Sequence, residues 1–324
     1  MYSINDLIVH LKHAHNIQVH PGQERDLRNY GYYHGYKGYR FIKTASNRMN
    51  ISNFNQVVSI NKFDLELKQL VYSKIMFIET ALKSYLLESI LDYAQTDDLN
   101  EIFKKCLTEY QTHQRGSSNY SKYFSKRMKI QMKINSALIR DYENNRGIEQ
   151  HFFNQDRPIP VWAVFESLSL GEFGSFLECC NETIRKKVSG LLSLPTNLDP
   201  NGKMVQKIIF CLRDLRNSVA HNNPIFDTRF KSGSIDQTLL TLLKTETSIS
   251  SIDFEDIDSY IILICYIYNK MGMKKDCISF IHEYIRICDT ILFNKIDARD
   301  YFRIFKTSHK NDLSRLEDFI RSSP

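Results

Sequence analysis

The chain has 324 residues, of which 42 % are apolar and 25 % charged, proportions that exclude a disordered or fibrous protein. Its formal net charge of +6 is compatible with a polyanionic partner but does not require one. No apolar run reaches the ~20 residues that span a bilayer, and the first residues lack the basic and apolar regions of a signal peptide. We therefore expect a cytoplasmic protein without a membrane segment.

The composition and the spacing of apolar residues predict a mostly helical fold. Glycine and proline are scarce (12 and 7), and apolar residues recur at three- and four-residue steps through long stretches. Ser3 is the predicted cap of the first helix, and Asp253 with Asp256 marks the start of a late one. Helices are predicted over 3–13, 24–29, 61–94, 99–110, 121–140, 162–180, 202–221, 253–271, 273–294 and 297–320.

Three stretches interrupt the helical pattern. Tyr30–Phe41 contains three closely spaced glycines among its tyrosines, which predicts a loop or a short strand. A polar loop precedes Pro158, and a Ser/Thr-rich connector spans 231–251. The sequence therefore predicts an all-α protein with one domain, 1–324. Its parts are an N-terminal Tyr/Gly-rich segment (1–60), a helical core (61–230) and C-terminal helices (250–324).

The cysteines and histidines do not predict a metal site. The seven cysteines have no Cys-x2-Cys spacing, their number is odd, and most lie in apolar helical patterns, as buried free thiols do. The cluster of four histidines between His10 and His20 contains one helix-compatible pair and no acidic or cysteine partner at ligand spacing. We expect neither a metal nor another cofactor.

The helix predicted over 121–140 has a basic face and an apolar face. The basic face suits an RNA backbone, since phosphate contacts supply most non-specific affinity, and it is equally typical of a solvated helix surface. The basic face consists of Lys122, Lys126, Lys129, Lys133 and Arg140. The opposite, apolar face consists of Phe124, Met128, Ile130, Ile134 and Leu138.

The segment 212–221, Leu-Arg-Asp-Leu-Arg-Asn-Ser-Val-Ala-His, contains the candidate catalytic residues. Metal-free RNA cleavage needs a base, an acid and positive charge on the phosphate. His221 can act as base or acid, and Arg216 can hold the phosphate. Asn217 lies four residues before His221 and can orient it. The alternative is structural: an Arg and a His at a helix end also favour the helix dipole.

Helix geometry complicates this candidate site. Arg213 and Asn217 share a face with His221, and Arg213 is a further candidate for RNA contact. Arg216 lies about 140° from His221 unless the helix ends near Val219. One chain thus offers a single motif histidine, so a homodimer that brings two copies together, one as acid and one as base, is mechanistically attractive.

The Tyr/Gly-rich segment offers candidate base-stacking residues. Tyr33 and Tyr36, next to Lys37, could stack on bases and contact phosphate, although such rings more often pack inside a protein.

Several blocks of the chain resemble the Abi-like family of bacterial abortive-infection proteins, the AbiD/AbiF group. The Tyr-rich element at 31–39 stands where the family has Gly-Tyr-Tyr-Arg-Leu-x-Gly-Tyr, and 158–173 is similar to its Pro-x-Trp and Glu-x-x-Ser-Phe-Gly segment. The long helix from Phe63 and the block 212–221, similar to the family's Leu-Arg-Asn-x-x-Ala-His, complete the likeness. The chain departs from the family at two positions: His34 replaces an Arg, and Asn222 replaces a second His.

The resemblance implies a HEPN-like helical bundle, growth arrest during phage infection, and RNA as substrate or partner. Arg-x4-His is the signature pattern of HEPN ribonucleases, so the expected function is metal-independent endoribonuclease activity. The chief alternative is a non-catalytic module that holds a structured non-coding RNA regulating toxicity. A third reading is a toxin component that acts through protein contacts and carries a vestigial site.

Overall fold

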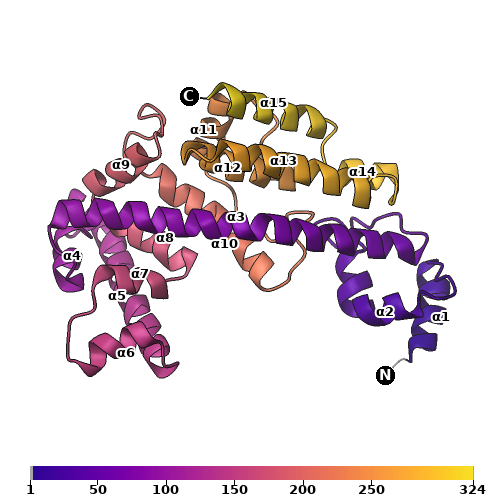
Figure 1. Ribbon diagram of the computed structural model, residues 1–324, viewed down its shortest axis with the longest axis horizontal. Helices are drawn as coiled ribbons and strands as arrows, with labels where there is room; N and C mark the ends of the chain where they lie inside the picture. Colours follow the sequence, from indigo (N-terminus) through magenta and orange to yellow (C-terminus); the bar gives the residue numbers. More distant parts are fainter. Residues whose placement is uncertain (1–2, 324) are drawn as a thin grey trace. The chain divides into compact units, whose positions relative to one another are not determined.

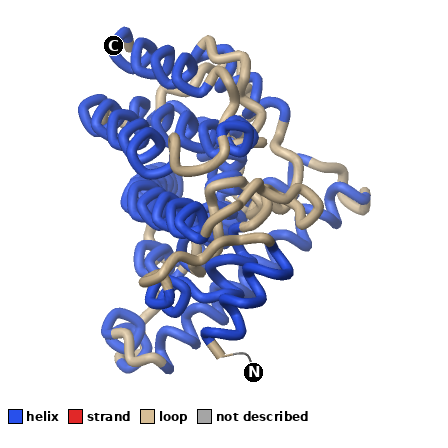
Figure 2. The backbone as a smooth tube through the Cα atoms, turned by 90° about the vertical axis from the view of Figure 1, so that its right-hand side faces the viewer, coloured by secondary structure: helices blue, strands red, loops and turns tan. Residues whose placement is uncertain are grey.

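The computed structural model describes residues 3–323, and the regular elements of that range are helices, with no strand among them (Figures 1 and 2). The prediction of an all-α fold is confirmed. The helices are α1 (Ile4–His15), α2 (Glu24–Tyr30), η1 (Gly31–Lys37), α3 (Phe54–Ala94), α4 (Leu99–Lys105), η2 (Glu109–Thr112), α5 (Ser118–Glu143), α6 (Gly147–Asn154), α7 (Val161–Ser167), α8 (Leu170–Cys179), α9 (Glu182–Leu191), α10 (Met204–Ala220), α11 (Gln237–Thr247), α12 (Ile257–Lys270), α13 (Lys274–Ile287), η3 (Cys288–Leu292), α14 (Ala298–Ile304) and α15 (His309–Ser322).

The chain divides into two compact units. Unit 1 consists of Met1–Ile75, Asp214–Ile235 and Leu240–Pro324, and unit 2 consists of Met76–Arg213 and Asp236–Leu239. The first and last parts of the chain therefore belong to the same unit. Helices α3 and α10 each begin in one unit and end in the other.

The C-terminal part of unit 1 is built around α12. This helix is buried from Ile257 through Asn269, as expected for a segment that is apolar on every face. Helices α13 and α15 pack beside it (Figure 1). The N-cap of α12 is Asp256, whose carboxylate accepts a hydrogen bond from the Ser259 N–H at 3.0 Å. The predicted start at Asp253 was thus three residues early.

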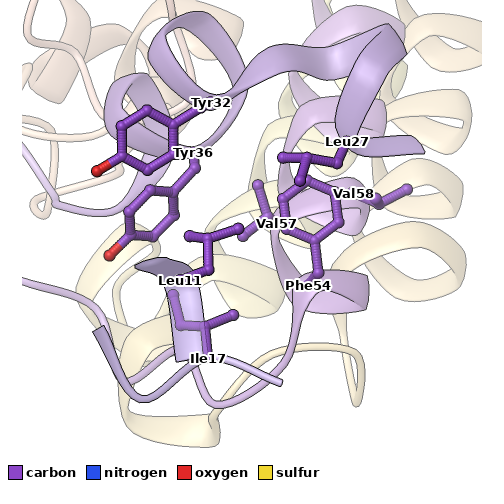
Figure 3. Close-up of a cluster of buried hydrophobic side chains, with 8 residues drawn as sticks. All are labelled: Leu11, Ile17, Leu27, Tyr32, Tyr36, Phe54, Val57 and Val58. Carbon is purple, nitrogen blue, oxygen red and sulfur yellow. The ribbon is translucent and has the colours of Figure 1, made fainter. Parts of the chain in front are cut away.

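The N-terminal part of unit 1 contains a helical capping box and a π-helix. Ser3 caps α1 as predicted, and its side chain exchanges hydrogen bonds with Asp6. The Tyr/Gly-rich segment, expected to be a loop or strand, instead forms the π-helix η1. Four-residue spacing puts Tyr32 and Tyr36 into one apolar cluster, and this burial outweighs the low helix propensity of the glycines. Figure 3 shows the cluster, which consists of Leu11, Ile17, Leu27, Tyr32, Tyr36, Phe54, Val57 and Val58.

In unit 2, α5 packs against α6, α7, α8 and η2. Ile130, Ile134 and Leu138 are buried there, as predicted for the apolar face. Met128, assigned to the same face, is 52 % exposed, so that assignment was wrong. Met128 precedes Ile130 by two residues, which places the two side chains about 160° apart around the helix axis.

Unit 2 also contains a buried ion pair that fixes α9. The Arg185 guanidinium, 1 % exposed, donates to the Glu109 carboxylate at 2.7 Å and to the Cys180 carbonyl. Gly202 has a φ of +64°, and a Cβ there would lie 2.5 Å from the backbone nitrogen of Lys186. Glycine is therefore required at the turn that leads into α10.

Helix boundaries were predicted less well than helix positions. The helix expected over 162–180 is two helices, because Ser169 caps α8 in a capping box with Glu172. The connector expected over 231–251 contains α11, and the segment 297–320 contains α14 and α15. The two helices α6 and α9 were not predicted at all.

The predicted burial of the cysteines is confirmed, since all seven are buried free thiols. Within residues 3–323, no helix is both long enough and apolar enough to cross a membrane. The same range holds no cluster of three or more His, Cys, Asp or Glu side chains arranged for a metal ion.

Candidate functional site

The candidate catalytic residues lie at the C-terminal end of α10. Arg216 and Asn217 are in its last two turns, and His221 follows its last residue. His221 and Asn217 are exposed, whereas Arg216 is half-buried with its Nε out of contact with solvent. An exposed imidazole can exchange protons with a bound substrate.

The chain leaves α10 through a well-defined helix stop. The His221 N–H donates to the Asn217 carbonyl at 3.0 Å, so helical geometry continues to the histidine. Asn222 then adopts a left-handed conformation (φ 54°), and the Asn223 N–H donates to the Ser218 carbonyl at 2.8 Å. This six-residue closure is the Schellman arrangement, which Asn tolerates better than most residues. Pro224 follows the stop, where proline is common.

A buried carboxylate on α3 holds the segment that follows His221. Asp64 is fully buried, and its Oδ1 accepts hydrogen bonds from the Ile225 and Phe226 N–H groups at 2.8 and 2.9 Å. Its Oδ2 accepts a 2.6 Å hydrogen bond from the Tyr39 hydroxyl. Burial and the neighbouring Asp64 charge raise the pKa of Tyr39, so this phenol stays protonated as a donor.

Lys68, one turn after Asp64, ties the same segment to α3. Its ammonium group lies 2.7 Å from Asp64 Oδ2 and donates to the Asn222 side-chain oxygen at 2.9 Å. Asn222 therefore has two structural roles in this chain, as the left-handed residue and as a lysine partner. We call Tyr39, Asp64, Lys68 and the turn 222–226 the Asp64 clamp.

The loop beyond the clamp is tied to the segment that follows η1. Arg229 donates to the carbonyls of Gly38 and Phe41 at 2.7 and 2.8 Å, and its guanidinium lies 4.2 Å from the Phe41 ring centroid. Asp227, buried beside it, accepts from the Lys43 N–H at 2.6 Å. Segments more than 180 residues apart in the sequence thus support the end of α10 together.

Arg216 and His221 do not share a face of the helix. Because α10 is intact through Ala220, the five-residue step separates the two side chains by about 140° around the axis. An end of the helix near Val219, the condition under which they would converge, does not occur. His221 is therefore the exposed titratable group of this motif, and Arg216 lies on the covered side of the helix.

Arg213 lies one turn earlier, in unit 2. Its side-chain stem passes over Gly171 of α8 so closely that a Cβ there would lie 2.9 Å from Arg213 Cδ. Its guanidinium lies 5.6 Å from the Phe210 ring centroid. This packing gives Arg213 a structural role, and explains why a glycine interrupts the apolar start of α8.

The predicted basic face lies on α5, but its lysines differ in environment. Lys122, Lys129 and Lys133 are exposed. Lys126 forms a 2.5 Å ion pair with Glu178 of α8, and its ammonium lies 5.0 Å from the Tyr123 ring centroid. Three of the four lysines are thus open to a polyanion, whereas Lys126 contributes to the packing of unit 2.

The candidate stacking residues of η1 also separate into two groups. Tyr33 is 63 % exposed, with the Lys37 ammonium 5.1 Å from its ring centroid. Tyr36 is only 4 % exposed and belongs to the cluster of Figure 3, which leaves no open ring face for a base. A stacking role is therefore compatible with Tyr33 and not with Tyr36 in this conformation.

The sequence analysis missed the Asp64 clamp. Asp64 and Lys68 occupy inward-facing positions of α3, next to Phe63 and Leu67, and both are buried. An Asp and a Lys four residues apart within the apolar stripe of a long helix were the available signal, because a charged pair at core positions requires a partner. The partner turn, whose Ile225 lies 161 residues from Asp64, could not be inferred from spacing.

One of the three comparisons with known proteins matches the region that contains this site. The model of one family, described as Abi-like protein, matches residues 25–227. The search of curated proteins and the search of solved structures found no significant match. The matched region contains the Tyr-rich element, the whole of α3, the motif of α10 and every residue of the Asp64 clamp. Because the match covers well over half of the chain, the protein belongs to the Abi-like protein family.

Proposed function

We propose that this protein acts in abortive infection as a metal-independent endoribonuclease of the HEPN type, with His221, Arg216 and Asn217 as its catalytic residues. Family membership supports the role in abortive infection. The observation that carries the proposal is an exposed imidazole at a helix end, followed by a turn that buried hydrogen bonds to Asp64 hold in place. Burying the polar groups of the Asp64 clamp costs free energy of desolvation. A helix end with a purely structural role does not require this cost.

The proposed reaction is transesterification within the RNA chain. A base removes the proton of a 2′-hydroxyl, whose oxygen attacks the adjacent phosphorus, and an acid protonates the departing 5′-oxygen. The products are a 2′,3′-cyclic phosphate and a 5′-hydroxyl end. His221 supplies one of the two proton transfers, and His221 of a second copy supplies the other. Arg216 stabilises the negative charge that develops on the phosphate, which requires its guanidinium to turn toward the substrate.

The test is cleavage of total RNA by purified protein in EDTA, with chemical mapping of the new ends. Wild type is expected to produce cyclic phosphate ends, and His221→Ala to cleave about 10²–10⁴-fold more slowly, the usual contribution of general acid–base catalysis. His34→Ala removes another exposed histidine and is the matched control, expected to keep wild-type activity. Cleavage by folded His221→Ala at the wild-type rate would remove His221 from the mechanism.

The second candidate function is RNA binding without cleavage, in which the chain holds a structured non-coding RNA. It is favoured by the separation of Arg216 and His221 around α10, together with the three exposed lysines of α5. Salt-sensitive RNA binding that survives His221→Ala, in a protein that produces no new RNA ends, would support this candidate over the nuclease.

A further inference from the structure

Two histidines of α1 converge on one tyrosine of η1, outside the α10 motif. His10 Nε2 and His15 Nε2 each lie 3.0 Å from the Tyr32 hydroxyl oxygen. The two imidazole rings meet edge to face, with their centroids 4.9 Å apart. The hydroxyls of Tyr32 and Tyr36 point to the same side, away from the apolar side chains of their cluster (Figure 3).

Several positively charged groups lie around this point. The Lys37 ammonium lies 5.1 Å from the Tyr32 ring centroid, and the Arg40 guanidinium lies 5.7 Å from that of Tyr36. Burial lowers the pKa of His15, and the charges that act on it most strongly, those of His10, Arg40, Arg48 and Lys37, lower it further. We call these side chains, which come from α1, η1 and the segment 40–48, the cationic cluster: His10, His15, Tyr32, Lys37, Arg40 and Arg48.

Counting protons shows how an anion fits the cationic cluster. With both imidazoles neutral, the Tyr32 hydroxyl can donate to one ring and accept from the N–H of the other. If the accepting ring takes up a proton, two N–H donors face one hydroxyl oxygen, and the tyrosine O–H points away from both rings. An oxygen-rich anion can accept from that O–H and offset the mutual repulsion of the cations.

We propose that the cationic cluster is a binding site for a phosphate group, and that binding is coupled to proton uptake by His10 and His15. The site is accessible, because both histidines, Lys37 and Arg40 are half-buried and Arg48 is exposed. A tetrahedral anion can accept from several N–H groups and the Tyr32 hydroxyl at once. This proposal does not depend on catalysis at His221, since the cluster shares no residue with the α10 motif.

The test is a titration of the histidine side chains by NMR on the full chain, with and without inorganic phosphate at constant ionic strength. Phosphate is expected to raise two imidazole pKa values by about 0.5–1 unit, because an anion favours the charged form. The shifted signals should be absent in His10→Gln and His15→Gln and unchanged in His13→Gln, which alters an exposed histidine of the same helix. Imidazole pKa values that stay within about 0.2 unit of their phosphate-free values overturn the proposal.

Arg48→Gln gives a second test, which leaves both histidines in place. Arg48 is exposed, so the variant is expected to fold, and the phosphate-induced shift should become smaller. A shift of wild-type size in this variant would contradict the proposed site.

The source of the phosphate is distinguished by short RNAs that carry either a 5′-phosphate or a 5′-hydroxyl. About tenfold tighter binding of the phosphorylated RNA, lost in His15→Gln, assigns the site to RNA ends, since a tenfold change corresponds to about 1.4 kcal/mol. Equal binding of both RNAs, with the response to inorganic phosphate intact, assigns it to free phosphate or a mononucleotide.

Discussion

Asp64 shows how a single carboxylate can determine the position of a distant functional residue. It accepts from two backbone N–H groups, a tyrosine hydroxyl and a lysine, all within unit 1. Each bond ends on a group that contacts or follows the turn after His221. The orientation of that turn therefore depends on one buried side chain of α3.

We predict that Asp64→Asn destabilises the protein by about 2–4 kcal/mol, since it leaves Lys68 buried beside a neutral amide. The amide can still accept from the two backbone groups, but its NH₂ faces the Tyr39 hydroxyl or Lys68 as a donor. Chemical denaturation measures the loss, and any His221-dependent cleavage should fall with it. Glu66→Gln, an exposed change on the same helix, is the control, and equal stability of the two variants would contradict this role.

Asp256 gives a prediction about how the stability of the protein depends on pH. Its burial, followed by the nearby Asp258, raises its pKa above the ordinary 3.8 in spite of Lys306 at 2.8 Å. The folded protein thus holds this proton more tightly than the unfolded chain, and the stability gained by protonation is lost as pH rises through the folded-state pKa. Asp256→Asn, which keeps a good helix cap, is expected to be at least as stable as wild type at pH 7.

Thermal unfolding measured at several pH values checks this expectation. The stability of Asp256→Asn relative to wild type should rise from acidic to neutral pH. Asp253→Asn removes the other carboxylate that contacts Lys306, but from a site that is 44 % exposed, and should show no such gain. A variant at position 256 that is less stable than wild type at every pH would contradict the prediction.

At the scale of elements, the sequence predicted helices where the spacing of apolar residues was regular, as in α3, α5, α10 and α12. Most of the apolar residues of these helices are buried, with Met128 of α5 as an exception. It failed where the cause is not local. The π-helix η1 forms because Tyr32 and Tyr36 are buried together, which outweighs the low helix propensity of its two glycines. The break between α7 and α8 depends on the cap at Ser169, which a continuous apolar pattern conceals.

The candidate site was predicted in part for the same reason. The motif 216–221 was found from its residue types, and the 140° separation of Arg216 and His221 followed from helix geometry. The burial and the contacts of each residue could not be predicted from the sequence. Neither the ion pair of Lys126 with Glu178 nor the burial of Tyr36 could be inferred, because both depend on which helix packs against which.

The differing lysines of α5 give a prediction for this element. Replacing Lys122, Lys129 and Lys133 by Glu should weaken RNA binding for all sequences and flatten its salt dependence, because phosphate contacts carry no base information. Lys126→Glu should instead reduce stability, since it places a second carboxylate beside Glu178. RNA binding measured against salt concentration tests the triple variant, and chemical denaturation tests Lys126→Glu. An unchanged salt slope in the triple variant would show that these lysines form only a solvated helix face.

At the scale of the whole molecule, the proposed reaction requires two proton transfers, and each chain has one histidine in its motif. We predict that the active species is a homodimer whose two His221 side chains act on one phosphate. Co-expression of His221→Ala with wild type should then produce heterodimers that are strongly impaired rather than half as active. Co-expression of His34→Ala with wild type is the control. A wild-type monomer that cleaves RNA at working concentration would show that one chain supplies both groups.

The division of unit 1 between the two ends of the chain has a consequence for synthesis on the ribosome. Asp64 and Tyr39 emerge before unit 2, yet α12, α13 and α15, which belong to the same unit as they do, emerge after it. Unit 2 lies almost entirely between them and can fold first. At about 5–20 residues per second, the stretch after His221 takes roughly 5–20 s to synthesise. During that interval the end of α10 has its Asp64 clamp but not the C-terminal helices of its unit, so the proposed nuclease activity, if it requires the whole unit, would appear only after those helices have emerged.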